Sequence, residues 1–138
     1  MNQDIKNSEG YTDITPYAAM CSMEREKRKY RPLAYICSPY SGDTEKNVER
    51  TKKFCRFALD KGYIPVAPHL MFPQFMDDSK ASERELAMRM DLILLGKCRV
   101  VLVLGDTVSE GMKKEIERAK KIGKQVKYFN GKFEEVTE

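Results

Sequence analysis

One carboxylate in this sequence occupies a helix position where only apolar side chains would be expected. Residues 112–122 have a helical pattern, and at 100° per residue their apolar stripe is made up of Met112, Ile116, Ala119, Ile122 and Gly123. Glu115 falls inside this stripe, between Ala119 and Ile122. A carboxylate on a core-facing stripe is costly unless it is paired, its pKa tends to rise, and such groups are enriched at functional sites. Glu115 is therefore a candidate catalytic group, unless it only borders the core and reaches water at the helix end.

The turn that precedes this helix has residues suited to binding an anion or a hydroxyl. Ser109 can cap the helix, and Gly111 lets the backbone approach a phosphate or a hydroxyl closely. For Ser109 alone, an ordinary helix cap is the simpler interpretation. An earlier turn at residues 38–43, Ser-Pro-Tyr-Ser-Gly-Asp, resembles a phosphate loop only loosely. It lacks the G-x-G-x-x-G and G-K-[ST] patterns, which argues against a dinucleotide dehydrogenase and against a P-loop ATPase or GTPase.

A long apolar and aromatic loop at residues 68–78 supplies further candidates, because loops of this length in compact domains are often binding segments. His69 could donate a proton or recognise a base, or it could be a structural hydrogen-bonding residue. The loop also contains four large apolar side chains, Met71, Phe72, Phe75 and Met76. They could sandwich a planar base, or they could seal the core or a contact between subunits.

The elements that must position these residues alternate between strands and helices. The patterns predict strands at 33–38, 63–67, 99–105 and 125–129, and helices at about 44–61, 82–97 and 112–122. Pro65 indicates an edge position for the second strand, or a very short strand. A capping box at residues 82–85 opens the second helix. This order predicts an α/β fold, namely a three-layer α/β/α sandwich with a parallel, Rossmann-like (flavodoxin-like) sheet of four to five strands.

The same order predicts that one crevice is built from three separate segments. In a parallel sheet the turns after the first three strands meet at the carboxyl edge, which brings residues 37–43, 68–78 and 106–115 together. The helix at 82–97 carries one apolar face, made up of Leu86, Met90, Ile93, Leu94 and Lys97. Asp91 lies at the edge of that face, about 100° from its centre.

Composition places the chain among ordinary globular proteins, since its 138 residues are 41% hydrophobic and 33% charged with a net charge of +4. We expect an α/β domain at 32–138, preceded by a polar extension at 1–31 with a helix from Thr15 and Pro16 to about Lys29. No apolar run approaches the roughly 20 residues of a membrane span, and the N-terminus lacks the apolar core of a signal peptide. We therefore expect a cytoplasmic protein that has no membrane partner.

Neither a cofactor nor a metal is expected. Four scattered cysteines without a C-x-x-C pair, together with one histidine, give no credible zinc or iron–sulfur site. The one basic run, at residues 24–31, contains acidic residues and no interleaved aromatic residues suited to base stacking. This composition argues against nucleic acid as a partner.

Four stretches together carry a resemblance to a known family. They are residues 35–40 (Tyr-Ile-Cys-Ser-Pro-Tyr), residues 62–68 (Gly-Tyr-Ile-Pro-Val-Ala-Pro), Asp91, and residues 109–115 (Ser-Glu-Gly-Met-Lys-Lys-Glu). Over residues 33–129 the chain resembles the nucleoside 2-deoxyribosyltransferase-like superfamily, which includes the deoxyribonucleoside 5′-monophosphate N-glycosidases. Within it, the chain is most similar to a branch of small, uncharacterised bacterial and phage-associated domains. The sequence departs from the family pattern at Arg99 and at residues 39–40.

The resemblance implies an N-glycosidic-bond enzyme, either a nucleoside deoxyribosyltransferase or a nucleoside or nucleotide N-glycosidase. Glu115 matches the nucleophile that attacks C1′ of the sugar, and Tyr35 matches a tyrosine that positions it. Asp91 matches an aspartate that orients the site and handles the leaving base. Ser109 and Gly111 match the turn that binds the 5′ end of the sugar. The other residues expected to contact substrate in the crevice are Ser38, Tyr40, Asp43, His69 and Met112.

The implied partner is a small nucleoside or nucleotide. The resemblance also implies a homo-oligomer, in which a neighbouring subunit often completes the pocket. Two other functions stay open. One is a non-catalytic module that senses a nucleotide or nucleotide-sugar in the same crevice, and the other is a scaffold domain that oligomerises through the aromatic loop.

Overall fold

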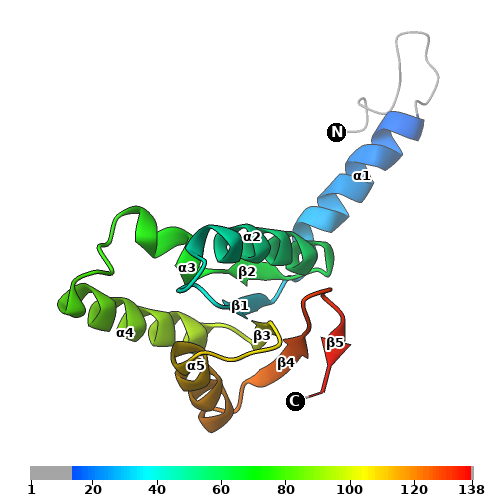
Figure 1. The fold of residues 1–138 in the computed structure, drawn as a ribbon. Helices are drawn as coiled ribbons and strands as arrows, with labels where there is room; N and C mark the ends of the chain where they lie inside the picture. Colours follow the sequence, from blue (N-terminus) through cyan, green and yellow to red (C-terminus); the bar gives the residue numbers. More distant parts are fainter. Residues whose placement is uncertain (1–13, 138) are drawn as a thin grey trace. The chain divides into compact units, whose positions relative to one another are not determined.

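The computed structural model describes residues 14–137, whose contacts divide the chain into two units between Tyr30 and Arg31. The first unit contains α1 (Ile14–Arg28), which begins and ends within one residue of the predicted helix. The second unit carries an α/β domain (Figure 1). Across residues 14–137, no helix combines the length and the apolar character that crossing a membrane requires.

The domain is built on a five-stranded sheet with the order β2-β1-β3-β4-β5. The four parallel strands are β1 (Leu33–Cys37), β2 (Ile64–Val66), β3 (Val100–Leu104) and β4 (Gln125–Phe129). The short β5 (Glu135–Val136) pairs with β4 in the antiparallel direction and was not predicted. The α/β class and the sheet size are thus confirmed, and so is the edge position of β2, which contains Pro65.

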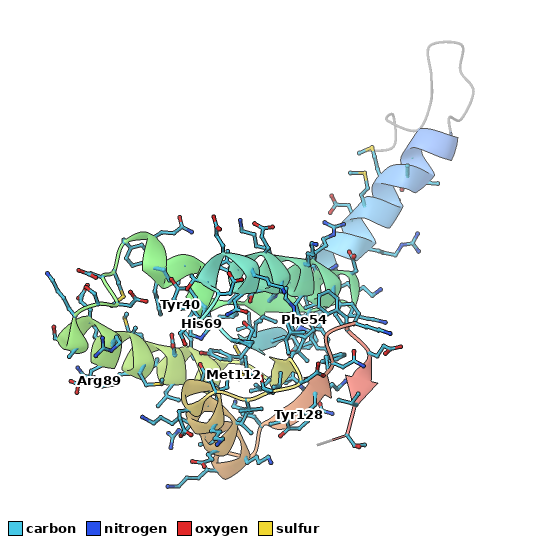
Figure 2. All side chains as sticks on the ribbon, viewed as in Figure 1. Tyr40, Phe54, His69, Arg89, Met112 and Tyr128 are labelled. Atoms are coloured by element: carbon cyan, nitrogen blue, oxygen red, sulfur yellow. The ribbon has the colours of Figure 1, made fainter. Side chains whose placement is uncertain are left out.

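Helices cover both faces of the sheet and complete the three layers (Figure 1). On one face α2 (Thr44–Asp60) packs on β1 through Phe54 and Ala58. On the other face α4 (Ala81–Lys97) and α5 (Glu110–Lys121) form a second core, which includes Leu95 and Met112. Figure 2 marks Phe54 and Met112, one from each layer. All five residues of the central strand β3 are buried, as its apolar sequence predicted.

Local sequence explains where the helices next to the sheet edge begin and end. The Asp43 carboxylate caps α2 by accepting a hydrogen bond from the Lys46 N–H group, and the Ser109 hydroxyl caps α5 in the same way for Met112. Gly123 follows α5 with a φ of 77°, a left-handed conformation that suits glycine and stops the helix. Each helix therefore starts at the carboxyl edge of the sheet, which is where the candidate residues were expected.

The segment predicted as one long loop is instead partly helical. It contains α3 (Pro68–Met71) and the 3₁₀ turn η2 (Phe72–Gln74), each with a proline in its first turn. Proline suits that position because the first N–H groups of a helix have no intrahelical partner. The apolar residues were interpreted as loop residues because four-residue helices are too short for a periodic pattern to appear.

The helix α4 begins within one residue of its predicted start, but the predicted cap was wrong and the predicted inward face was right only in part, since Leu94 packs against the core. The helix begins at Ala81 after Lys80, without a side-chain cap, so Ser82 lies inside the helix. Glu83 instead accepts a hydrogen bond from the Asp77 N–H group. The inward face carries Asp91 and Leu95, whereas the predicted residues Leu86 and Ile93 are exposed.

The cause of this error is that α4 is apolar on nearly all sides at its C-terminal half, where residues 92–95 read Leu-Ile-Leu-Leu. Periodicity cannot select an inward face when apolar residues occupy every direction. The packing of α4 against β1 and α5 makes that selection, and it turns an aspartate inward.

Candidate active site

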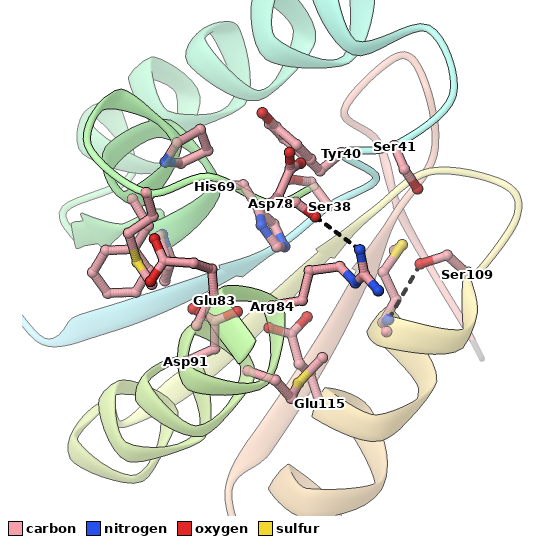
Figure 3. Close-up of a pocket in the computed structure, with 18 of the residues that line it drawn as sticks. Ser38, Tyr40, Ser41, His69, Asp78, Glu83, Arg84, Asp91, Ser109 and Glu115 are labelled. Carbon is pink, nitrogen blue, oxygen red and sulfur yellow. Dashed lines mark hydrogen bonds between the residues drawn. The ribbon is translucent and has the colours of Figure 1, made fainter. Parts of the chain in front are cut away.

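A pocket of about 380 Å³ opens at the carboxyl edge of the sheet (Figure 3). It lies between the turn after β1, the α3–η2 segment, α4 and the N-terminus of α5. Its volume falls in the range of small-molecule sites, which is about 300–1,000 Å³. The three segments that the strand order predicted to meet do meet here, and α4 adds a fourth wall.

Glu115 projects from the second turn of α5 into this pocket and is 1% exposed. Both of its carboxylate oxygens accept hydrogen bonds from β1. The Tyr35 hydroxyl donates a hydrogen bond to Oε2, and the Cys37 thiol donates to Oε1 over 3.5 Å. Tyr35 and Cys37 are two residues apart on the strand, so their side chains leave the same face of the sheet. The inward direction of Glu115, which the helical stripe predicted, is confirmed.

The environment of Glu115 sets its protonation. Burial raises its pKa to about 6, and the hydrogen bonds from Tyr35 and Cys37 oppose this rise. Burial and the neighbouring Glu115 charge raise the pKa of both Tyr35 and Cys37. Both groups therefore keep their protons near neutral pH and stay donors to the carboxylate.

Asp91 is the second buried acid, projecting from α4 with 3% of its surface exposed. Burial and the Glu115 charge raise its pKa to about 7. Its Oδ1 atom is buried and has no hydrogen-bond partner among the described residues. An unpartnered buried oxygen is costly unless a ligand or a proton satisfies it. Because this oxygen belongs to a residue that lines the pocket, a ligand in the pocket could satisfy it.

His69 and Tyr40 stack on each other at the pocket wall, with ring centroids 5.5 Å apart and an interplanar angle of 24° (Figures 2 and 3). Burial lowers the pKa of His69, so its imidazole is neutral at pH 7. Burial and the Asp78 charge raise the pKa of Tyr40, which keeps its phenol protonated. The stacked pair thus presents aromatic surface and neutral polar atoms to the pocket.

The N-terminus of α5 forms the opposite part of the lining, through Ser109, Gly111 and Met112. The Ser109 hydroxyl accepts a hydrogen bond from the Met112 N–H group. The two N–H groups before it, at the start of the helix, have no intrahelical partners. A Cβ atom at Gly111 would lie 3.7 Å from the Cε atom of Met88 on α4, so the two helices approach closely here. Ser38 also lines the pocket, and its hydroxyl bonds to that of Thr51.

Three of these groups offer ligand atoms that lie within 4.8 Å of one another, namely His69, Asp91 and Glu115. Such a set of one imidazole and two carboxylates resembles a divalent-metal site. Both Glu115 oxygens also accept hydrogen bonds from neutral donors on β1, and each oxygen keeps a second lone pair. The absence of a metal, which the sequence predicts, stays a prediction.

Most of the residues singled out in the sequence come together at the pocket. Its lining includes Ser38, Tyr40, His69, Asp91, Ser109, Gly111, Met112 and Glu115, while Tyr35 reaches it through Glu115. Asp43 does not line the pocket, because its carboxylate caps α2. Among the apolar residues of the predicted loop, Phe72 and Met76 line the pocket, whereas Met71 and Phe75 are exposed and do not.

Sequence reasoning named Asp91 but missed other α4 residues of the lining, which include Arg84 and Met88. These residues share a helix face with Asp91 and Leu95, at successive spacings of four, three and four residues. An inward assignment of Asp91 would therefore have found them. The Arg84 guanidinium extends into the pocket mouth and donates to the Asp78 carbonyl oxygen over 2.9 Å (Figure 3).

The chemistry available to this site follows from two buried acids in different environments. With a pKa of about 6 for Glu115 and about 7 for Asp91, one proton distributes mainly to Asp91 near neutral pH. Because the two groups are close, their titrations are coupled. The site can therefore hold one carboxylate as a nucleophile or charge stabiliser and one carboxylic acid as a proton donor.

Comparisons with known proteins agree with this fold. A family model described as "Domain of unknown function (DUF7768)" matches residues 32–129. No curated protein matches the chain. Among solved structures, the chain is similar to a 2-deoxyribosyltransferase from the psychrotolerant bacterium Bacillus psychrosaccharolyticus, with 19% sequence identity, a TM-score of 0.56, and coverage of 76% of this chain and 77% of that chain. At this identity the likeness shows a common fold, which is the fold that the sequence resemblance implied.

Proposed function

We propose that this chain, which belongs to the family described as Domain of unknown function (DUF7768), is an enzyme that breaks an N-glycosidic bond in a nucleoside or nucleotide. The observation that carries the proposal is the pair of buried acids in one pocket, with Glu115 held by two donors from β1 and Asp91 left with an unpartnered oxygen. The fold shared with a 2-deoxyribosyltransferase supports the same reaction class.

Glu115 is the proposed nucleophile. In the first step one of its oxygens bonds to C1′ of the sugar while the bond from C1′ to the base nitrogen breaks, and the electron pair leaves with the base. The carboxylate offsets the positive charge that builds on the sugar ring. Protonated Asp91 gives its proton to the departing base. In the second step water or a second base attacks C1′, the ester bond breaks, and ionised Asp91 takes up the proton.

The spacing of the two acids favours this covalent route. Retaining glycosidases hold their carboxyl groups about 5–5.5 Å apart, whereas inverting enzymes need about 6.5–9.5 Å to fit a water molecule between them. Here one oxygen of Asp91 and one of Glu115 lie within 4.8 Å of each other. An oxygen–oxygen separation this short suits the retaining route, and a glycosyl ester on Glu115 is the intermediate expected from this proposal.

The rest of the pocket accounts for the two ends of such a substrate. Ser109 and Gly111, at the free N–H groups of α5, suit the 5′ hydroxyl or phosphate of the sugar. The stacked pair of Tyr40 and His69, together with Phe72, offers aromatic surface for the planar base. Asp91 lies within reach of His69, which puts the proposed proton donor on the base side.

The test is the release of free base from a panel of ribonucleosides, deoxyribonucleosides, their 5′-monophosphates and NAD. Wild-type protein should release base from at least one of them, and Glu115→Gln should lose this activity by about three orders of magnitude or more, because the nucleophile is gone. Glu117→Gln is the matched control, since Glu117 is exposed on the same helix outside the pocket. Intact-mass analysis after rapid quenching should detect the added sugar in wild-type protein and in Glu117→Gln, but not in Glu115→Gln.

Equal release by wild type and Glu115→Gln would contradict the assignment. Tight binding of a nucleotide without turnover, unchanged by Glu115→Gln, would instead support the sensor function that the sequence left open. Both outcomes are read in the same set of assays, so the experiment separates an enzyme from a binding module.

A further inference from the structure

The mechanism above gives no role to Cys37, although its thiol touches the proposed nucleophile. Cys37 is fully buried at the end of β1, on the same face as Tyr35. Its Sγ atom lies 3.5 Å from Oε1 of Glu115 and 3.9 Å from the carbonyl oxygen of Met112. A thiol has one proton to donate, and the shorter contact leads to the carboxylate.

We propose that Cys37 is a positioning residue for Glu115, whose thiol fixes the second carboxylate oxygen and favours the ionised form of the acid. This inference rests on the proposed function, because it assigns Cys37 a part in the reaction of Glu115. With Tyr35 on Oε2 and Cys37 on Oε1, both oxygens are held from one strand, which restricts rotation of the carboxylate about its terminal bond.

The thiol is suited to donate rather than to react. Burial and the adjacent Glu115 charge raise the pKa of Cys37 well above its ordinary value, so the sulfur keeps its proton. A thiolate would repel Glu115, whereas a protonated thiol stabilises its charge. The bond is weak compared with that of Tyr35, but it acts in a buried setting where each donor counts for more than in water.

The groups that face Glu115 come from three elements besides its own helix. They are Tyr35 and Cys37 from β1, Asp91 from α4 and His69 from α3. His69 is kept neutral by burial, and Asp91 carries the shared proton near neutral pH. Arg84 lines the same pocket from α4 and contacts the Asp78 carbonyl oxygen. Among the described residues, Tyr35 and Cys37 are therefore the groups that donate hydrogen bonds directly to the Glu115 carboxylate.

The sign of the effect follows from the reaction. Glu115 must be ionised to attack, so activity falls as the pH drops through its pKa. Loss of the Cys37 donor removes a contact that favours the ionised form, which raises the pKa of Glu115. The acidic limb of the profile of kcat/KM against pH should then move to higher pH.

The experiment compares Cys37→Ala with Cys37→Ser and with Cys98→Ala. Serine keeps a donor at the same place. Cys98 is a second buried thiol in the same core layer, and the structure shows no hydrogen bond between it and Glu115. The Cys98→Ala variant therefore controls for the effect of the cavity that is left when a buried thiol is removed. Each variant is measured in two ways, through the pH profile of base release and through an NMR titration of the Glu115 carboxyl carbon in protein labelled with ¹³C-glutamate.

In Cys37→Ala we expect the acidic limb and the carboxyl titration to move up by about half a pH unit, a roughly threefold loss of rate at pH 5 relative to pH 7. Cys37→Ser should recover most of the shift, and Cys98→Ala should show none. Equal profiles for Cys37→Ala and Cys98→Ala would overturn the proposal. Because the NMR titration needs no turnover, it decides the role of Cys37 even if no N-glycosidic activity is found, which would count against the proposed function alone.

Discussion

The two faces of strand β1 are built for different purposes. On the face toward α2, Ala34 and Ile36 pack against an aromatic group that joins Phe54 and Phe57 to Phe129 and Phe133. On the face toward α4 and α5, Tyr35 and Cys37 meet two buried acids. Because successive side chains of this five-residue strand point to opposite faces of the sheet, the same strand contributes to an apolar core on one face and to a polar site on the other.

The two faces contribute to the stability of the domain with opposite signs. Stacked and edge-on phenyl rings add to the free energy of unfolding through burial and through their geometry. Buried carboxyl groups with raised pKa values subtract from it at neutral pH, because the folded protein holds their ionised forms at a cost. The aromatic layer on one face of the sheet therefore offsets the energetic cost of the buried carboxyl groups on the other face.

The largest effect on stability is expected from the aromatic face. Phe54 is fully buried and contacts three other phenyl rings, so Phe54→Ala should lower the free energy of unfolding by about 3–5 kcal/mol. Urea denaturation followed by circular dichroism measures this loss. The rate of base release per folded molecule should not change, because Phe54 lies on the far side of the sheet from the pocket. A matching loss of rate would mean that the two faces are not independent.

The opposite result is expected on the face toward the pocket, where Asp91→Asn should stabilise the protein while it slows the proposed reaction. A carboxyl group whose pKa is higher in the folded state contributes stability below its unfolded pKa and loses that contribution as the pH rises through the folded value. For Asp91 this window runs from its ordinary value of 3.8 to about 7. Asparagine does not titrate, so the variant escapes this loss.

Denaturation of both proteins at two pH values measures the effect. At pH 8 we expect Asp91→Asn to be more stable than wild type by an amount on the order of 2–4 kcal/mol, and at pH 4 by almost nothing. Base release should fall by about 10²-fold at pH 7, since the proton donor is lost. A gain of the same size at both pH values would point to a packing effect instead of a titration.

A smaller effect is expected in the pH dependence of base release by the wild-type protein. The proposed reaction needs Glu115 ionised and Asp91 protonated, with pKa values of about 6 and about 7. The profile of kcat/KM should therefore be bell-shaped with its maximum between about pH 6 and pH 7, and the two limbs report the coupled pair. Asp91→Asn should flatten the alkaline limb. A constant rate from pH 5 to pH 9 would remove both acids from the reaction.

Much of the fold could be predicted from sequence because its signals are local and strong. The apolar run of β3 and the glycine after α5 set bounds that the structure confirms. Glu115 could be assigned to the buried stripe because the other face of α5 is rich in lysine, which leaves the periodicity unambiguous. Where polar and apolar residues are well separated, pattern alone is enough.

The remainder of the site depended on tertiary packing. In α4 the residues around Asp91 are apolar in several directions, so only contacts with β1 and α5 determine that the aspartate is buried and that Arg84 and Met88 join the pocket. Asp43 was assigned to the pocket because the turn after β1 leads there. Its carboxylate instead caps α2, by accepting a hydrogen bond from the Lys46 N–H group. Capping and binding draw on the same residue types, so sequence cannot separate them.

The smallest effect is expected at the rim of the pocket, where Arg84 tests how far the charged lining takes part in the proposed substrate recognition. Arg84 is exposed, donates to the Asp78 carbonyl oxygen and forms no ion pair with another described residue. If the 5′ end of the substrate lies near the N-terminus of α5, a guanidinium here should favour a phosphate on that end.

Arg84→Gln should then lower kcat/KM for a nucleoside 5′-monophosphate by about tenfold and for the matching nucleoside by less than about twofold, because water screens an exposed charge. Arg84→Lys, which keeps the charge, should retain part of the preference. An equal loss on both substrates would show that Arg84 acts by holding the segment around Asp78, in which case the discrimination between the two substrates lies deeper in the pocket, with the groups that contact the sugar.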